Sequence, residues 1–207
     1  MICAIVLAAG ESRRMGVQKL LLPFGSTTVV GHIVDQLLAS IVDQVIVVVG
    51  HEADRITEEL ADRPVDIVTN PDYKTGMLSS VRCGLRVVPQ QCEAVMLTLG
   101  DQPAITSKLV DEMVGAFRTT VKSILVPVYQ GKRGHPLVFA KHYRDEILTS
   151  FDDVGLRGLL HAHLGDVFEL NVSTPDVLSD IDFPEDYQRE IDSLGQNLRR
   201  NNRAESK

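Results

Sequence analysis

The amino-acid sequence predicts an α/β protein with a mostly parallel β-sheet that is covered by helices on both faces. Short apolar runs rich in β-branched residues alternate with longer amphipathic stretches, and this alternation is typical of parallel sheets. The short runs are apolar at nearly every position, as expected for strands that are buried on both faces. With 207 residues, of which 44% are hydrophobic, the chain is long enough to bury a sizeable core.

The first part of the chain gives the clearest pattern. Each short apolar run has the length of a strand and is followed by Gly, Asn, Asp or Pro, which predicts strands at residues 2–7, 45–49, 65–68, 95–99 and 124–128. The amphipathic stretches between these runs predict helices at about residues 27–39, 52–62, 77–88 and 107–119.

The pattern changes after residue 128. A turn-rich stretch at 129–134 and a short apolar run at 136–139 predict an antiparallel excursion. Beyond it the sequence predicts helices at 141–149 and 156–163, a strand at 167–171 and a closing helix at 184–194, with Pro184 and two acidic residues in its first turn. We therefore expect one domain over residues 1–192, and a polar, disordered tail at 193–207.

Charge and composition restrict the classes of partner. The net charge of −7 argues against binding to nucleic-acid backbones, and no apolar run reaches the roughly 18 residues that a membrane span needs. The first residues do not resemble an export signal. Cys3, Cys83 and Cys92 form no CxxC pair, so we predict reduced thiols in a cytoplasmic protein, without nucleic-acid or membrane partners.

The loop after the first predicted strand is glycine-containing and basic. It reads Leu7-Ala-Ala-Gly-Glu-Ser-Arg-Arg-Met-Gly-Val-Gln-Lys19, and ligands of parallel sheets collect at the carboxyl ends of the strands. Gly10 allows close approach of the backbone to a ligand, and Arg13, Arg14 and Lys19 oppose the single charge of Glu11. The loop therefore suits a polyphosphate, and the alternative is a solvated turn with surface arginines. P-loop, dinucleotide and hydrolase-elbow motifs do not occur.

Carboxylates follow two later segments. Asp101 comes directly after the strand at 95–99, where an aspartate caps a helix or binds a hard cation. The following helix already has a hydroxyl residue at its cap position, which favours cation binding. In the acidic cluster at 180–186, Asp180 and Asp182 are predicted to share one side, with Ile181 on the other; the alternative is an acidic cap for the closing helix. A polyphosphate loop with two separated carboxylates suits Mg²⁺-assisted phosphoryl chemistry.

A family resemblance depends on five motifs in a fixed order: Leu7-Ala-Ala-Gly-Glu-Ser-Arg-Arg-Met-Gly with Lys19, Thr75-Gly-Met-Leu-Ser-Ser-Val81, Gly100-Asp-Gln-Pro103, Arg133-Gly-His-Pro136 and Asp180-Ile-Asp-Phe-Pro-Glu-Asp186. In these motifs the sequence resembles the MobA-like nucleotidyltransferases, specifically their molybdenum cofactor cytidylyltransferase branch, over about residues 2–190. The resemblance implies a Rossmann-like, three-layer α/β/α fold of the nucleotide-diphosphosugar transferase type. It also implies transfer of CMP from CTP to molybdopterin-bound molybdenum, with release of pyrophosphate.

The resemblance also implies roles for individual residues. Arg14, Lys19 and Asp101 would be catalytic, and Asp101 and Asp182 would hold Mg²⁺. The acceptor side would be lined by Arg133, Gly134 and His135. Asp153 and Arg157 correspond to a more loosely matched family motif. The nucleotide would be bound by Leu7, Ala8, Ala9, Gly10, Glu11, Ser12, Arg13, Arg14, Met15, Lys19, Gly76, Ser80 and Asp101.

The substrates are less directly specified by the sequence. A phosphate monoester is already largely ionised at neutral pH, because its second pKa is about 6, so the reaction needs no general base. Guanylyl-transferring relatives resemble Leu-Ala-Gly-Gly where this chain has Leu7-Ala-Ala-Gly10. The resemblance thus implies that the methyl group of Ala9 takes space beside the base, and we expect CTP to be preferred over GTP. Two alternatives stay open: an acceptor that is another sugar or alcohol phosphate, and a non-catalytic carrier that hands the cofactor to a molybdenum hydroxylase. The missing glycine fingerprint disfavours a dinucleotide-dependent oxidoreductase.

Overall fold

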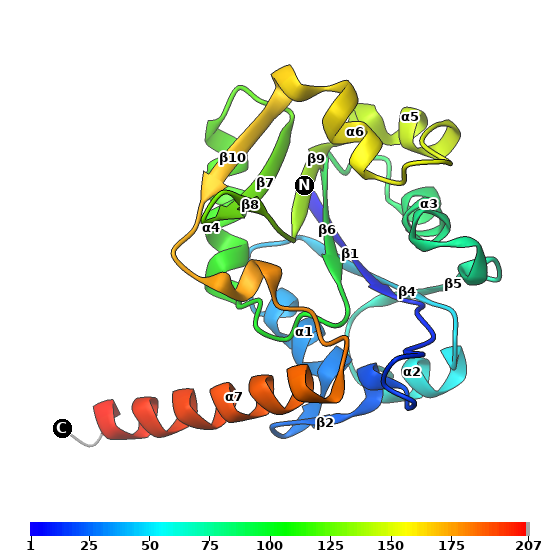
Figure 1. Cartoon of the computed structure of the whole chain (residues 1–207). Helices are drawn as coiled ribbons and strands as arrows, with labels where there is room; N and C mark the ends of the chain where they lie inside the picture. Colours follow the sequence, from blue (N-terminus) through cyan, green and yellow to red (C-terminus); the bar gives the residue numbers. More distant parts are fainter. Residues whose placement is uncertain (206–207) are drawn as a thin grey trace.

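The structure is a computed structural model that describes the backbone of residues 1–205 and the side chains of residues 1–196 (Figure 1). Its strands are β1 (Ile2–Ala8), β2 (Pro23–Phe24), β3 (Thr27–Thr28), β4 (Gln44–Val49), β5 (Asp66–Thr69), β6 (Ala94–Leu99), β7 (Ile124–Tyr129), β8 (Lys132–Arg133), β9 (Leu137–Ala140) and β10 (Val167–Asn171). Its α-helices are α1 (Val29–Leu38), α2 (Ala53–Glu59), α3 (Met77–Val87), α4 (Ser107–Thr119), α5 (Arg144–Thr149), α6 (Arg157–Ala162) and α7 (Pro184–Glu205).

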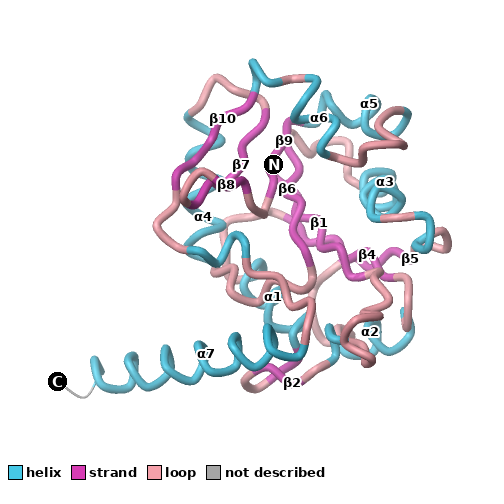
Figure 2. The backbone as a smooth tube through the Cα atoms, viewed as in Figure 1, coloured by secondary structure: helices cyan, strands magenta, loops and turns pink. Residues whose placement is uncertain are grey.

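The main sheet is mostly parallel, as predicted. Its strand order is β10-β7-β9-β6-β1-β4-β5, with β8 paired to β7. The central strand β1 is parallel to both β4 and β6, whereas β9 runs antiparallel to β6 and β7 and forms the predicted excursion. Leu7 pairs with Leu99, and Ala8 pairs with Val49. The carboxyl ends of these three central strands therefore meet at one edge of the sheet (Figure 2).

Helices cover both faces of the sheet, which confirms the three-layer α/β/α architecture. Alternate residues of β1 belong to two separate buried clusters: Ala4 and Val6 pack with α1, α2 and α4, whereas Cys3 and Ile5 pack with α3, α5 and α6. Successive side chains of a strand point to opposite faces, so an apolar β1 serves both layers (Figure 1). Within the described residues, no helix has the length and apolarity that crossing a membrane requires.

The structure differs from the sequence prediction at two places. Residues 27–28 form strand β3, which pairs with β2 in a short hairpin, so α1 begins at Val29. The Thr28 hydroxyl caps this helix by accepting a hydrogen bond from the backbone N–H of Gly31 at 3.1 Å. Helix α7 continues through most of the predicted tail as far as Glu205, because this segment contains no proline and a single glycine costs only about 1 kcal/mol. Residues 206–207 lie outside the described residues.

The N-terminal part of α7 packs against the body of the protein and buries one acidic side chain. Tyr187, Ile191 and Leu194 contact the core cluster beneath α1 and α4, and Glu190 is buried beside them. Burial raises the pKa of the Glu190 carboxyl, and the nearby carboxylates of Asp176 and Asp186 raise it further. Arg189 lowers the pKa in part, and the net effect is that the charged form of Glu190 is less favourable in the folded protein than in the unfolded chain.

We expect the substitution Glu190→Gln to stabilise the protein near neutral pH. A carboxyl pKa that is raised in the folded state lowers stability as the pH rises from the unfolded pKa toward the folded one. Glutamine avoids this loss, so the melting temperature should rise by about 1–3 °C. Below the ordinary carboxyl pKa the two proteins should melt alike. Thermal unfolding at several pH values measures this, with the exposed Asp192→Asn as control; a lower melting temperature of E190Q at neutral pH contradicts the prediction.

Candidate nucleotide-binding site

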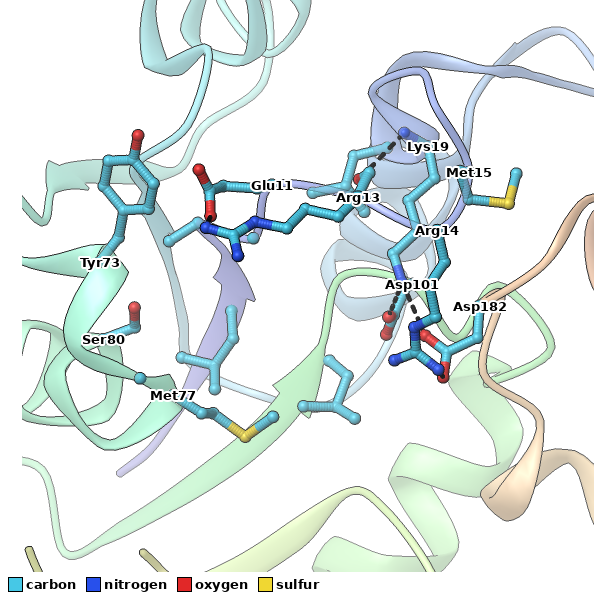
Figure 3. Close-up of a pocket in the computed structure, with 17 residues that line it drawn as sticks. Glu11, Arg13, Arg14, Met15, Lys19, Tyr73, Met77, Ser80, Asp101 and Asp182 are labelled. Atoms are coloured by element: carbon cyan, nitrogen blue, oxygen red, sulfur yellow. Dashed lines mark hydrogen bonds and ion pairs between the residues drawn. The ribbon is translucent and has the colours of Figure 1, made fainter.

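A cavity of about 390 Å³ opens at the carboxyl end of the central strands. It lies between the loop that follows β1, the end of β6, the start of α3 and the segment before α7 (Figure 3). Its walls are formed by Leu7, Ala9, Gly10, Glu11, Ser12, Arg13, Arg14, Met15, Lys19, Leu20, Tyr73, Gly76, Met77, Ser80, Leu99, Asp101 and Asp182. All the residues predicted to bind the nucleotide line this cavity except Ala8, which is fully buried at the end of β1.

Charged side chains from three distant segments meet at one end of the cavity. The ammonium group of Lys19 lies 2.5 Å from Asp101 Oδ2 and 3.3 Å from Asp182 Oδ1, and it donates a hydrogen bond to the carbonyl oxygen of Ile181 at 2.6 Å. Arg14 Nη1 lies 2.9 Å from Asp182 Oδ2 (Figure 3). The three residues predicted to be catalytic thus point into the same space.

The two acidic segments are tied to each other through their backbones. The backbone N–H of Ile181 donates to the carbonyl oxygen of Asp101 at 3.0 Å, and the Ile181 side chain is fully buried in the core. Of the two aspartates predicted to share one side, Asp182 lines the cavity and Asp180 does not. Gln102, which is also buried, donates from Nε2 to Asp180 Oδ1. Burial raises the pKa of the Asp180 carboxyl, as do the neighbouring Asp101 and Asp182, whereas the Gln102 hydrogen bond lowers it. These contacts fix the spacing between Asp101 and Asp182.

The loop after β1 is shaped by a buried glutamine that the sequence reasoning missed. Gln18 accepts a hydrogen bond from the Ser12 hydroxyl at 2.8 Å and donates from Nε2 to the carbonyl oxygens of Gly10 and His51. Ser12, whose φ is 52°, also accepts from the backbone N–H of Lys19 at 3.2 Å. Ser12 therefore folds the loop back and sets the direction of Lys19. A glutamine in a polar loop has no sequence signal that distinguishes this role.

The remaining charges of the loop offset each other. Arg13 pairs with Glu11 at 2.6 Å, and its side chain is largely exposed. The positive charge that faces the two aspartates therefore comes from Arg14 and Lys19.

The opposite end of the cavity carries no net charge. Tyr73, Met77 and Ser80 line it, away from the Lys19 cluster, and the Glu11–Arg13 ion pair lies on the same side (Figure 3). Gly76 has φ 120° and ψ 170°, a conformation that only glycine adopts readily. The cavity therefore provides one end suited to phosphates and another suited to an uncharged ring system.

A second cavity of about 600 Å³ adjoins the first, and Gly76 and Met77 line both. All three residues predicted to face the acceptor line this second cavity, namely Arg133, Gly134 and His135. A Cβ atom at position 134 would lie 2.1 Å from the carbonyl oxygen of Val177, so this position has no room for a side chain. The guanidinium of Arg133 pairs with Glu169 at 2.7 Å.

Other polar groups of the second cavity come from the start of α6 and the segment before it. Arg157 lines it, as does Asp152, which is held by Arg82 at 2.6 Å, whereas Asp153 lies outside its walls. Burial lowers the pKa of the His135 imidazole, Asp101 raises it and Arg157 lowers it. His135 is thus favoured in its neutral form, which can donate and accept hydrogen bonds.

The donor set beside Lys19 fits a hard divalent cation. A positive group, the Lys19 ammonium, already lies among three oxygens, from Asp101, Asp182 and the Ile181 carbonyl. Carboxylate oxygens are the ligands that Mg²⁺ and Mn²⁺ accept. Over the described part of the chain, no group of three His, Cys, Asp or Glu side chains could hold a metal ion by itself. A cation at Asp101 and Asp182 would therefore need further ligands from water and from a bound phosphate.

Comparison with known proteins identifies the family. Residues 4–167 match the model of the MobA-like NTP transferase domain. The chain belongs to this family. Two curated relatives match most of its length: the molybdenum cofactor cytidylyltransferase of Escherichia coli, 28% identical over 88% of this chain and 92% of the relative, and the nicotine blue oxidoreductase of Paenarthrobacter nicotinovorans, 27% identical over 77% of this chain and 81% of the relative.

Solved structures of the family share the fold. A nucleotidyl transferase from Methanothermobacter superposes with a TM-score of 0.83 at 27% identity, covering 95% of this chain and 99% of its own. A Mycobacterium tuberculosis protein in complex with manganese superposes with a TM-score of 0.79 at 30% identity, covering 93% and 98%. This protein is thus a nucleotidyltransferase, and it has the expected nucleotide-diphosphosugar transferase fold.

We expect Mn²⁺ to bind the isolated protein weakly and to bind at least about tenfold more tightly when CTP is present, because nucleotide phosphates complete its coordination. The substitution Asp101→Asn should weaken binding in both conditions. Electron paramagnetic resonance of free Mn²⁺ measures this, after subtraction of the Mn²⁺ that CTP binds without protein, with the exposed Asp192→Asn as control. Tight binding that is independent of CTP, or that survives D101N, contradicts the two-carboxylate site.

Proposed function

We propose that this protein transfers CMP from CTP to the molybdopterin-bound molybdenum cofactor and releases pyrophosphate, with Mg²⁺ as its metal ion. The observation that carries the proposal is the meeting of Arg14, Lys19, Asp101 and Asp182 at one end of a cavity whose other end is neutral. The similarity to the Escherichia coli molybdenum cofactor cytidylyltransferase over most of both chains supports the choice of substrates.

The charges of the site support the need for a divalent cation. Arg14 and Lys19 balance Asp101 and Asp182, so these four side chains carry no net charge together. A triphosphate and a second phosphate must nevertheless be brought into contact, and two anions at contact distance repel each other. A divalent ion held by Asp101 and Asp182 would supply positive charge to the phosphate oxygens.

The reaction itself needs little from the protein beyond placement and charge. An oxygen of the acceptor phosphate attacks the α-phosphorus of CTP, and the bond from that phosphorus to the bridging oxygen of pyrophosphate breaks. The acceptor is already ionised at neutral pH, so no side chain has to remove a proton. Lys19 and Arg14 would stabilise the charge that develops on the phosphate oxygens and on the leaving pyrophosphate.

The second cavity provides the acceptor site of this proposal. It shares the wall formed by Gly76 and Met77 with the nucleotide cavity, so an acceptor bound there lies next to the nucleotide. Its walls combine apolar side chains, among them Leu78, Leu97 and Leu156, with the cationic Arg157. This combination suits a ring system that carries a phosphate.

The meeting of Lys19, Asp101 and Asp182 favours an enzyme over a non-catalytic carrier. A protein that only bound and delivered the cofactor would have no need for two carboxylates spaced by a backbone hydrogen bond and bridged by a lysine. We therefore place the carrier hypothesis second and make it an outcome of the experiment below.

We expect Asp101→Ala to lower turnover by about 10³-fold, the size of the loss when one major transition-state contact is removed. The melting temperature should change little, because Asp101 is partly exposed at the cavity wall. Pyrophosphate release from CTP, Mg²⁺ and molybdenum cofactor measures the effect, with the exposed Asp192→Ala on α7 as control. Full cofactor delivery by D101A would favour the carrier. No pyrophosphate with the pterin acceptor, but release with another phosphate monoester, would reject the proposed acceptor.

We expect CTP to be used at least about tenfold more efficiently than GTP. Ala9 lines the cavity, and a Cβ atom at Gly50 would lie 2.8 Å from both Ala9 Cβ and Tyr73 Cβ, so this wall is already closely packed. A larger purine would press against it, and a misfit of this kind costs about 1–3 kcal/mol. Matched kcat/KM measurements with the two nucleotides decide the matter; equal turnover overturns the preference.

A further inference from the structure

A buried asparagine lies behind the neutral end of the nucleotide cavity. Asn70 follows β5 and is 3% exposed, and it is not among the residues that line the cavity. Its backbone N–H donates to the carbonyl oxygen of Val49 at 2.8 Å. Its side-chain oxygen accepts from the backbone N–H of Asp72 at 3.0 Å. A backbone N–H can only donate, so this contact fixes which way the Asn70 amide is turned.

The amide NH₂ group of Asn70 consequently faces two serines at the start of α3. It donates to Ser79 Oγ at 2.8 Å and to Ser80 Oγ at 3.0 Å. Both serine oxygens therefore act as acceptors toward Asn70. Each hydroxyl still has one proton to donate elsewhere.

The two hydroxyls differ in where that proton can go. Ser79 donates to the backbone carbonyl oxygens of Asp72 and Gly76, at 3.0 and 2.8 Å. Ser80 has no further hydrogen-bond partner in the part of the chain that the structure describes, it is 4% exposed, and it lines the nucleotide cavity. Figure 3 places it with Tyr73 and Met77, at the end away from Lys19 and Asp101.

We infer that Asn70 is a positioning residue for base selection. Because the Asn70 amide donates a hydrogen bond to Ser80 Oγ, the Ser80 hydroxyl is left to donate its own proton to an acceptor atom of the nucleotide base. The inference rests on the proposed function, since it assumes that the neutral end holds the base of CTP. A pyrimidine such as cytosine offers a carbonyl oxygen and a ring nitrogen as acceptors. A buried hydroxyl whose proton has no protein partner binds such an atom favourably and rejects a ligand that leaves it unpaired.

The substitution Asn70→Asp tests this by reversing polarity with almost no change in shape. A carboxylate can still accept from the backbone N–H of Asp72, but toward Ser80 it accepts instead of donating. Ser80 would then donate its proton to the introduced carboxylate and present only lone pairs to the base. We expect the Kd of CTP with Mg²⁺, measured by isothermal titration calorimetry, to rise about 10- to 100-fold. The Kd of inorganic triphosphate, which has no base, should stay within about twofold.

Further variants separate this role from a purely structural one. Ser80→Ala should weaken CTP binding about tenfold, and adding Asn70→Asp to Ser80→Ala should weaken it little more, because no hydroxyl remains to be reversed. Ser79→Ala is the matched control: Ser79 shares the same Asn70 amide but donates to the backbone, so CTP affinity should not change. Melting temperatures check that every variant is folded.

The outcomes distinguish the inference from the function on which it rests. N70D that binds CTP as tightly as the original protein overturns the inference. Equal weakening by N70D with and without the Ser80 hydroxyl also overturns it, as does a matching loss of triphosphate affinity, since either shows a general effect of the new charge. An original protein that binds triphosphate but shows no preference for CTP over it contradicts instead the placement of the base, and with it the proposed function.

Discussion

The site depends on one interaction, the placement of the Lys19 ammonium between the carboxylates of Asp101 and Asp182. These residues are far apart in the sequence, and only the fold brings them together. The parallel pairing of β1 with β6 places the first loop beside Asp101. The backbone hydrogen bond from Ile181 to Asp101, together with the buried Ile181 side chain, brings in Asp182. Without the Lys19 ammonium, the two negatively charged carboxylates of Asp101 and Asp182 would repel each other at this separation.

The strands and the motif residues could be predicted from sequence because their signals are local. Apolar runs bounded by turn residues indicated β1, β6 and β7, and the carboxyl-edge rule placed the first loop and Asp101 together. The hairpin of β2 and β3 was missed because strands of two residues carry no periodicity. Gln18, Asn70 and Gln102 were missed for another reason: their roles depend on partners that only the folded chain brings within hydrogen-bond distance.

An acidic protein can bind a polyphosphate because local pairing, not net charge, sets the potential of the cavity. The chain carries a formal charge of −7, yet Glu11 is occupied by Arg13 and Asp182 by Arg14. Asp101 is likewise paired with Lys19, so the acidic side chains that line the cavity each contact a basic group. Beyond about 8–10 Å at physiological ionic strength the remaining surface charge is largely screened, so it does not prevent anion binding at the cavity.

The start of α3 contributes both to the uncharged end of the first cavity and to the wall that it shares with the second cavity. Tyr73 and Ser80 lie at the neutral end of the first cavity, whereas Gly76 and Met77 form the wall between the two cavities. The positive φ of Gly76 makes the chain turn there and begin the helix. In the proposed function, selection of the base and the position of the acceptor would therefore depend on one short segment that does not include Lys19 or Asp101. Changes in this segment would then alter which substrates bind and leave the charged cluster of Lys19, Asp101 and Asp182 unchanged.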